Sequence, residues 1–223
     1  FVGIIDEKLK NFKIDVLNAG VVGYSPSIYY AKIAKYYGAE IPFIRTKKIS
    51  SKNSPDYEWV NTVFKFYKKE KINFSHYFIL RPTSPFRTAK SIKSAWEKFS
   101  KNKSAESLRA IKLVSEHPGK MWVEKNNFIK ALINGKVNKQ PYYNSQYTTL
   151  PKVYAQDASL EISRLDVIKK YKTITGKKIL PYHSKNLEGF DINFPIDLIF
   201  AKFIIKEKLI KFQKISKKSF FKI

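Results

Sequence analysis

Strand-like apolar segments alternate with amphipathic helical segments through the middle of this chain, and this alternation constrains the fold most strongly. Residues 53–71 combine Ser54 as the expected N-cap with apolar residues at helical spacing, which predicts a helix. The unbroken apolar run of residues 76–81 predicts a buried strand, and residues 91–99 predict a second helix that Thr88 caps. The pattern therefore predicts an α/β fold, with a mostly parallel, Rossmann-like sheet, helices on both faces and ligands at the carboxyl ends of the strands.

The rest of the chain continues this pattern. Further strands are expected at residues 13–20, 39–45, 107–113, 158–163 and 178–183, and further helices at residues 24–38, 166–170 and 195–206. Between them, a Pro-Gly turn precedes two short strands around Trp122 and Phe128, and a polar, tyrosine-rich loop covers residues 135–156. The three tryptophans, Trp59, Trp96 and Trp122, are expected in the core. We expect an amino-terminal segment over residues 1–30, one domain over residues 31–206 and a basic tail over residues 207–223.

The composition is that of a globular protein, with 43% apolar and 15% aromatic residues in a chain of 223 residues. No apolar run approaches the roughly 18 residues that a membrane-spanning helix needs. The sequence has no cysteine, which excludes disulfides, thiolate metal sites and a cysteine nucleophile. We therefore expect a cytoplasmic protein without a membrane partner.

The net charge of +25 raises a nucleic-acid hypothesis, because clustered cations gain affinity by releasing counterions. The lysines, however, are scattered along every segment, which is typical of solvated positions, so we do not expect a nucleic-acid partner. The alternative of an RNA- or membrane-surface binder that uses the basic tail stays open. Only five of the 43 basic residues are arginines, whose planar guanidinium groups suit the recognition of phosphate and carboxylate. They are Arg45, Arg81, Arg87, Arg109 and Arg164.

Residues 81–88, RPTSPFRT, form the first candidate site, because this loop leaves the carboxyl end of a predicted central strand. Two prolines stiffen the backbone, and Thr83 and Ser84 offer hydroxyl groups. Arg81 and Arg87 offer guanidinium groups for an anion. The competing interpretation is a well-capped connection that binds no ligand.

Residues 189–197, GFDINFPID, form the second candidate site. Asp191 ends a strand-like segment just ahead of a helix that Pro195 begins. Helix capping is the competing interpretation, because Asp197 suits the positive end of that helix. If both candidates serve one reaction centre, Asp191 must lie next to Thr83, and we expect this arrangement.

A third candidate is the Pro-Gly turn that His117 and Lys120 flank. Lys120 is suited to a sugar carboxylate or a phosphate. A lone histidine more often has a structural role than a catalytic one, and we expect a structural role for His117.

Five segments, taken in order, resemble those of acylneuraminate cytidylyltransferases over residues 31 to about 204. They are AEIPFIR, ILRPTSPFRT, SLRAIKL with HPGKMW, LPKVYAQDASLEIS and EGFDINFPIDLIFAKFI. The resemblance implies an enzyme that joins CTP to a nonulosonic, sialic-acid-like sugar acid of nine carbons and releases pyrophosphate. It also implies Mg²⁺ as the cofactor and a homodimer as the common assembly.

The resemblance implies roles for individual residues as well. Asp191 matches one member of an aspartate pair that holds Mg²⁺ against the nucleotide phosphates, and Asn193 stands in place of the second, so the metal site should be weaker. Arg87 and Lys120 join Asp191 as expected catalytic residues. The expected substrate-binding residues are Arg45, Arg81, Thr83 and Ser84 at the nucleotide, and Gln146 and Asp157 at the sugar acid.

The sequence departs from this family at its start. The glycine-rich, basic loop that wraps the CTP triphosphate has no counterpart here. Residues 1–30 instead resemble a short stretch of GDSL-like hydrolases, and the alternative that stays open is a strand and loop that merely replace the usual start. Positioning the triphosphate supplies much of the rate enhancement in such reactions, so we expect these 223 residues to form no detectable CMP-sugar. The alternative function is a non-catalytic remnant of the same fold that still binds a sugar or a nucleotide.

Overall fold

The computed structural model describes residues 2–5, 32, 35–36, 41, 43–46, 48–51, 53–72 and 74–210. Its contacts divide the chain into two compact units, unit 1 over residues 1–110 and 157–223 and unit 2 over residues 111–156. The sequence predicted one domain over residues 31–206, which includes all of unit 2 and most of unit 1. The expected strand at residues 13–20, most of the helix at residues 24–38 and most of the basic tail lie outside the described residues, so these expectations stay predictions.

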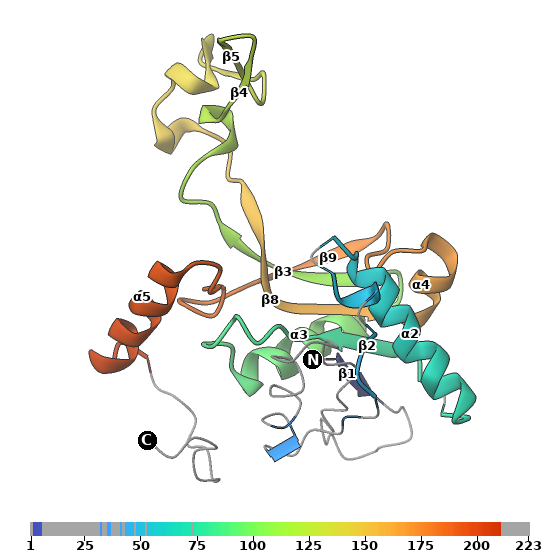
Figure 1. The fold of residues 1–223 in the computed structure, drawn as a ribbon. Helices are drawn as coiled ribbons and strands as arrows, with labels where there is room; N and C mark the ends of the chain where they lie inside the picture. The colour runs from blue at the N-terminus through green and yellow to red at the C-terminus, as the bar shows by residue number, and fades with distance from the viewer. Residues whose placement is uncertain are drawn as a thin grey trace. The chain divides into compact units, whose positions relative to one another are not determined.

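A five-stranded sheet in the order β1-β2-β8-β3-β9 forms the centre of unit 1 (Figure 1). Its strands are β1 (Val2–Ile5), β2 (His76–Ile79), β8 (Tyr154–Arg164), β3 (Ser107–Leu113) and β9 (Ile179–His183). The sequence predicted all of these strands except β1, and it placed the start of β8 four residues too late. Of the strand expected at residues 39–45, the described residues retain a single bridge at Ile44.

The central strand β8 runs antiparallel to its neighbours. It pairs with β2 from His76↔Arg164 to Ile79↔Glu161, and its contacts with β3 also advance in opposite directions, from Ser107–Ser163 to Arg109–Glu161. The pairing of β1 with β2 is antiparallel too. The expectation of a mostly parallel sheet is therefore wrong for these pairs. Parallel neighbours need a crossover, usually an α-helix, and residues 114–153 between β3 and β8 contain no α-helix.

Four helices of unit 1 confirm the predicted ones. They are α2 (Asp56–Lys69), α3 (Ala89–Lys101), α4 (Leu165–Tyr171) and α5 (Pro195–Lys206). Thr88 caps α3 as expected, because its Oγ1 accepts a hydrogen bond of 3.1 Å from the Ser91 amide. The N-cap of α2 is Pro55 and not Ser54, whose hydroxyl instead donates to the Lys48 carbonyl in the short 3₁₀ helix η1 (Lys48–Ser50).

Side chains of β2 alternate between two apolar cores, as side chains of a strand must. Tyr77 and Ile79 pack with the buried face of α2, whereas Phe78 and Leu80 pack with α3. Helices therefore cover both faces of the sheet, which confirms that part of the expected architecture. The buried face of α2 is the one that the sequence predicted, and it consists of Trp59, Val60, Val63, Phe64 and Tyr67.

Unit 2 consists of two hairpins and three 3₁₀ turns. The hairpins pair β4 (Trp122–Lys125) with β5 (Phe128–Ala131) and β6 (Lys136–Val137) with β7 (Gln140–Pro141), and the turns are η2 (Pro118–Lys120), η3 (Tyr142–Asn144) and η4 (Tyr147–Thr149). Both hairpins use two-residue loops with positive φ at both positions, 53° and 63° at Asn126 and Asn127 in the first. The predicted strands around Trp122 and Phe128 are confirmed, and the expected loop at residues 135–156 contains the second hairpin.

The structure tests the expected places of two aromatic residues of unit 2, His117 and Trp122. His117 is buried and structural, since its Nδ1 accepts a hydrogen bond from the Gly119 amide and its Nε2 lies 2.9 Å from the Pro151 carbonyl oxygen. Trp122 is 44% exposed and packs against Tyr143, with 4.8 Å between ring centroids, so its expected place in the core is wrong. An isolated two-stranded hairpin has no further sheet or helix packed against it that could bury a tryptophan.

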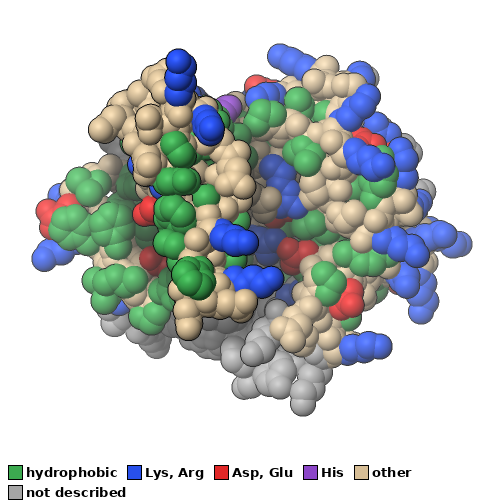
Figure 2. All heavy atoms as spheres, turned by 90° about the horizontal axis from the view of Figure 1, so that it is seen from above, with side chains coloured by type: hydrophobic (Ala, Val, Ile, Leu, Met, Phe, Trp, Pro, Cys, Tyr) green, Lys and Arg blue, Asp and Glu red, His purple; other side chains and the backbone are tan. Residues whose placement is uncertain are grey.

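Lysine and arginine side chains are spread over the face shown in Figure 2 and do not gather into one patch there. This distribution agrees with the solvated lysines that the sequence predicted. No helix among the described residues has the length and apolar character that a membrane crossing requires.

Candidate active site

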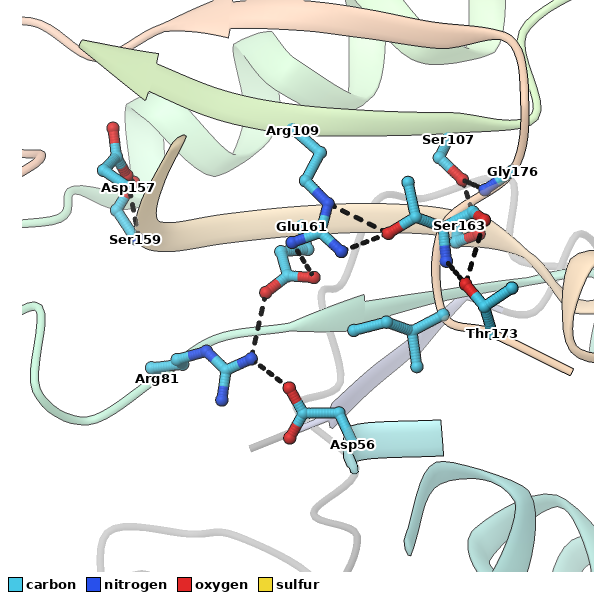
Figure 3. A network of polar contacts seen from close by, with 12 residues as sticks. Asp56, Arg81, Ser107, Arg109, Asp157, Ser159, Glu161, Ser163, Thr173 and Gly176 are labelled. Atoms are coloured by element: carbon cyan, nitrogen blue, oxygen red, sulfur yellow. Dashed lines mark hydrogen bonds and ion pairs between the residues drawn. The ribbon is translucent and has the colours of Figure 1, made fainter. Parts of the chain in front are cut away.

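The first candidate loop, residues 81–88, leaves β2 with Arg81 held between two carboxylates (Figure 3). Arg81 Nη2 donates to Asp56 at the start of α2, and it lies 3.1 Å from Glu161 Oε1 in the middle of β8. The other oxygen of Glu161 lies 2.8 Å from Arg109 Nη1. Glu161 therefore bridges two guanidinium groups, and Arg81 is committed to protein contacts.

These contacts belong to a buried polar face of the sheet. Glu161 and Ser163 are only 4% and 2% exposed, and Ser163 lies 2.9 Å from Ser107 across the strand pair. The Gly176 amide donates to Ser107 over 2.7 Å, and Arg109 Nε donates to Thr175 Oγ1 over 3.0 Å (Figure 3). The backbone that follows α4 is thus tied to β3 by side-chain hydrogen bonds.

Charge and burial shift the pKa values around Arg81. Burial opposes ionisation of Asp56, but hydrogen bonds from Arg81 and Trp59 and the nearby guanidinium groups keep its pKa below the usual range. Burial likewise acts against the charge of Arg81, yet Asp56 and Glu161 raise its pKa. Arg45 lies over the Trp59 ring, 4.9 Å from the centroid, and burial lowers its pKa. All of these groups remain charged near neutral pH.

Arg87 differs from Arg81, because it has no acidic partner among the described residues. Its Nη1 donates to two backbone oxygens, those of Arg81 at 3.1 Å and Ser159 at 2.6 Å. Burial lowers the pKa of Arg87 to about 10, so the group still carries its charge at neutral pH. A fixed and uncompensated guanidinium group is suited to an anionic ligand.

The second candidate segment lies against the first, as expected. The Ile192 amide donates to the Thr83 carbonyl over 2.9 Å, and the rings of Phe86 and Phe190 lie 5.5 Å apart. Asp191 therefore adjoins the 81–88 loop. Two oxygens here, Asp191 Oδ1 and Ser84 Oγ, are buried and have no hydrogen-bond partner among the described residues. Buried polar atoms are normally paired, so these two oxygens have unused capacity to bind a hydrogen-bond donor or an ion.

Asp197 has the structural role that helix capping predicted. Its Oδ2 accepts hydrogen bonds from the amides of Asn193 at 2.9 Å and Phe194 at 2.8 Å, which fixes the entry into α5. Asn193 is exposed, and its backbone is held in this way next to Asp191. Within the described residues, no group of three or more histidine, aspartate or glutamate side chains is placed to hold a metal ion. Mg²⁺ often needs only one or two carboxylates beside substrate phosphates.

The residues expected at the sugar acid fall in different parts of the chain. Lys120 and Gln146 belong to unit 2, where both are exposed and Lys120 Nζ donates to the Tyr143 carbonyl over 3.3 Å. Asp157 belongs to unit 1 and is buried. Its carboxylate already accepts hydrogen bonds from the Ser159 amide at 2.9 Å and the Ser184 hydroxyl at 2.6 Å, so it orders the start of β8. The substrate roles of all three residues stay predictions.

Sequence reasoning missed Asp56 and Glu161. Asp56 had the position of an ordinary acidic residue in the first turn of a helix. Glu161 lies in DASLEIS, whose strict alternation is typical of a strand with one solvated face. The sequence contains one weak indication of the contact between Arg109 and Glu161. Both residues occupy polar positions in predicted strands, where their side chains can lie on the same face of the sheet.

Comparisons with known proteins identify the fold of the chain. No protein-family model and no curated protein matches the chain. Among solved structures, it is similar to CMP:2-keto-3-deoxy-manno-octonic acid synthetase complexed with CTP, with a TM-score of 0.53, 10% identity, and 85% of this chain and 80% of that chain covered. It is also similar to 4-diphosphocytidyl-2C-methyl-D-erythritol synthase from Anaerococcus prevotii, with a TM-score of 0.47, 10% identity, and 80% and 76% of the chains covered. The chain therefore has the α/β fold of the first of these nucleotidyltransferases.

Proposed function

We propose that this chain is a cytidylyltransferase whose turnover is impaired in these 223 residues and that it binds CTP where the 81–88 loop meets Asp191. The observation that carries the proposal is the hydrogen bond from the Ile192 amide to the Thr83 carbonyl, which joins the loop that contains Arg87 and the unpartnered Ser84 oxygen to the segment that contains Asp191. The likeness of the fold to an enzyme solved with CTP supports the choice of nucleotide. The acceptor in this proposal is a nonulosonic, sialic-acid-like sugar acid, to which Gln146 and Asp157 contribute contacts.

In the proposed reaction, a hydroxyl oxygen of the sugar acid forms a bond to the α-phosphorus of CTP while the bond from that phosphorus to the bridging oxygen breaks. Pyrophosphate leaves with the bonding electrons, and the proton of the attacking hydroxyl group passes to solvent water. Arg87 binds phosphate oxygens and takes up developing negative charge, and Ser84 donates its hydroxyl hydrogen to the same group. Lys120 orients the acid group of the acceptor.

Mg²⁺ is the proposed cofactor. The unpartnered oxygen of Asp191 and the amide oxygen of Asn193 are the ligands that the chain offers, and hard oxygen ligands suit this ion. When bound, the ion neutralises phosphate charge and orients the triphosphate. With one carboxylate in place of two, we expect weaker binding of the ion than in a site with an aspartate pair.

Arg81 acts indirectly in this proposal. Since Asp56 and Glu161 occupy its guanidinium group, Arg81 fixes the start of the loop and presents its carbonyl oxygen to Arg87. The charge of Arg45 also favours the ionised form of Asp56. The loop is thereby ordered before a nucleotide arrives, which reduces the entropic cost of binding.

A second candidate function is a binding protein without turnover. It is favoured by Asn193, which offers the proposed Mg²⁺ an uncharged oxygen in place of a second carboxylate. In either case we place the protein in the cytoplasm as a homodimer, with no nucleic acid or membrane as partner.

The two functions differ in a pyrophosphate-release assay with CTP, Mg²⁺ and a panel of nonulosonic acids. We expect no CMP-sugar from the 223 residues alone and measurable CMP-sugar when a family-like, glycine-rich segment precedes Ala31. Robust turnover by the unmodified chain would show that the triphosphate needs no such segment. If the extended chain binds CTP but forms no CMP-sugar, the second function, a binding protein without turnover, would be favoured.

A further inference from the structure

A cavity in unit 1 lies at the opposite end of β2 from the 81–88 loop of the proposed catalytic site. It has a volume of about 580 Å³ and opens where β2 begins and β8 ends, at the paired residues His76 and Arg164. Arg81 follows the other end of β2. Since residues of a strand are spaced by about 3.3 Å, His76 lies roughly 15 Å from Arg81. The cavity is therefore separate from the 81–88 loop.

The walls of this cavity are ordered by local hydrogen bonds. The chain leaves α3 at Asn102, whose side-chain oxygen accepts hydrogen bonds from the amides of Ser104 at 3.2 Å and Ala105 at 3.1 Å. On the facing wall, Arg164 makes a two-point contact with Asp166, with 3.1 Å and 2.6 Å between the paired atoms. Both walls are thus defined without a ligand, which favours binding of a small molecule.

Cations outnumber acids around the cavity. Arg164, Lys103 and Lys169 line it, and Asp166 is the single carboxylate among its lining residues. Asp166 is paired with Arg164, whereas neither lysine has an acidic partner in the part of the chain that the structure describes. The cavity therefore carries an excess positive charge and is suited to a ligand with one or two negative charges.

Aromatic rings form the apolar part of the wall. The His76 ring lies edge-on to Trp96, with 5.2 Å between centroids and 75° between planes, and edge-on to Phe99 at 5.7 Å and 88°. All three residues line the cavity. Rings next to cations favour a ligand that combines a planar ring with an anionic group, because the ring packs while the anion pairs.

We propose that this cavity binds a nucleoside monophosphate, independently of the catalytic site and of Mg²⁺. The base packs against the wall of Trp96 and Phe99, and the phosphate meets Lys103 and Lys169. The volume lies within the range of roughly 300–1,000 Å³ that is usual for small-molecule sites. A single phosphate matches the two unpaired lysines better than a triphosphate does.

Calorimetric titration of the full chain without Mg²⁺ tests this site, with CMP, cytidine and inorganic phosphate as separate probes. We expect saturable CMP binding and weaker binding of both fragments. The double variant Lys103→Glu, Lys169→Glu should weaken CMP binding roughly tenfold or more, because charge-assisted contacts become repulsive. Lys101→Glu is the matched control, since Lys101 is exposed on the last turn of α3 but does not line the cavity, and it should change the affinity by less than about twofold.

Each alternative outcome has a distinct meaning. No saturable CMP binding, equal affinity for cytidine, or equal effects of the two charge-reversal changes would overturn the proposal. Binding of a single-stranded oligoribonucleotide but not of CMP would overturn it in favour of a nucleic-acid surface. Loss of CMP binding in Arg87→Lys would place the ligand at the catalytic site, which overturns this second site while it supports the proposed function.

Discussion

On one face of β8, Leu160 and Ile162 pack under α3, whereas on the other face Glu161 and Ser163 join a network with Arg81 and Arg109. The exposed fractions hardly differ, at 1% for each apolar residue and 4% and 2% for the polar ones. One strand thus builds the core with its even-numbered residues and organises the candidate site with its odd-numbered residues. The difference teaches that alternating apolar and polar residues in a strand indicate two different faces. The polar face need not be exposed to solvent, because it can be buried in a network of polar side chains.

The largest expected effect concerns the apolar face. Leu160→Ala should lower the free energy of unfolding by about 2–5 kcal/mol, because it leaves a cavity beneath α3. Urea denaturation measures this change. Ile129→Ala in β5 is the control, since Ile129 is 60% exposed and its truncation should cost less than about 0.5 kcal/mol. Similar costs for the two variants would show that the α3 face is not the tightly packed core described here.

The polar face should respond less strongly in stability. Glu161→Gln leaves Arg81 and Arg109 without their shared charge, and we expect a loss of about 2 to 3 kcal/mol. This is below the roughly 3–5 kcal/mol of a fully buried pair, because the Arg81 side chain is 32% exposed and can regain water. Urea denaturation again gives the value, with the exposed Glu124→Gln as control. A neutral Glu161→Gln would mean that the network does not hold the loop.

Arg87→Lys tests the same face through binding and not through stability. Loss of the planar guanidinium group should weaken CTP binding by about 1–3 kcal/mol, since a charged contact with fixed geometry is lost. Calorimetric titration and a thermal melt of the same variant separate the two effects. A lowered melting temperature with unchanged CTP affinity would show that Arg87 serves only the fold.

The smallest effect is expected at Glu106, an acid that binds a neutral hydroxyl and backbone amides and lies 3.6 Å from a single cation, the exposed Lys170. Hydrogen bonds from Tyr171 and from the amides of Lys178 and Lys177 lower its pKa from 4.5 to about 2. A lowered pKa in the folded state stabilises the protein above about pH 4.5, and this contribution is lost as the pH falls towards about 2. The stability difference between the native chain and Glu106→Gln should therefore shrink over this interval. A constant difference in urea midpoints would contradict the assignment.

Much of the fold was predictable from local chemistry. The bounds of α5 and β3 agree with the predicted ones, and the proline at the first position of α5 marks the start of that helix clearly. The direction of β8 was not predictable in the same way. The alternation of strands and helices suggested helical crossovers between parallel strands. The connection from β3 to β8 contains no α-helix, and this is the feature that agrees with their antiparallel pairing.

The candidate site was predictable in part. The meeting of Thr83 with the segment at Asp191 follows from two loops at one end of a sheet, and the structure brings them together. The ion pairs of Arg81 with Asp56 and Glu161 depend on contacts between residues far apart in the sequence, and the local sequence does not predict such contacts. An arginine beside a loop looks the same in sequence whether it pairs with a ligand or with the protein.

The central claim is that Asp191, beside the 81–88 loop, holds the metal ion that binds the nucleotide, and one titration tests it most directly. CTP affinity is measured with and without Mg²⁺ for the native chain, Asp191→Asn and Asp197→Asn. Both aspartates flank the start of α5, but Asp197 is engaged in capping and Asp191 has an unpartnered oxygen. The account predicts that Mg²⁺ strengthens CTP binding by roughly tenfold or more in the native chain and in Asp197→Asn, and that Asp191→Asn abolishes this gain. An equal gain in all three proteins would contradict it.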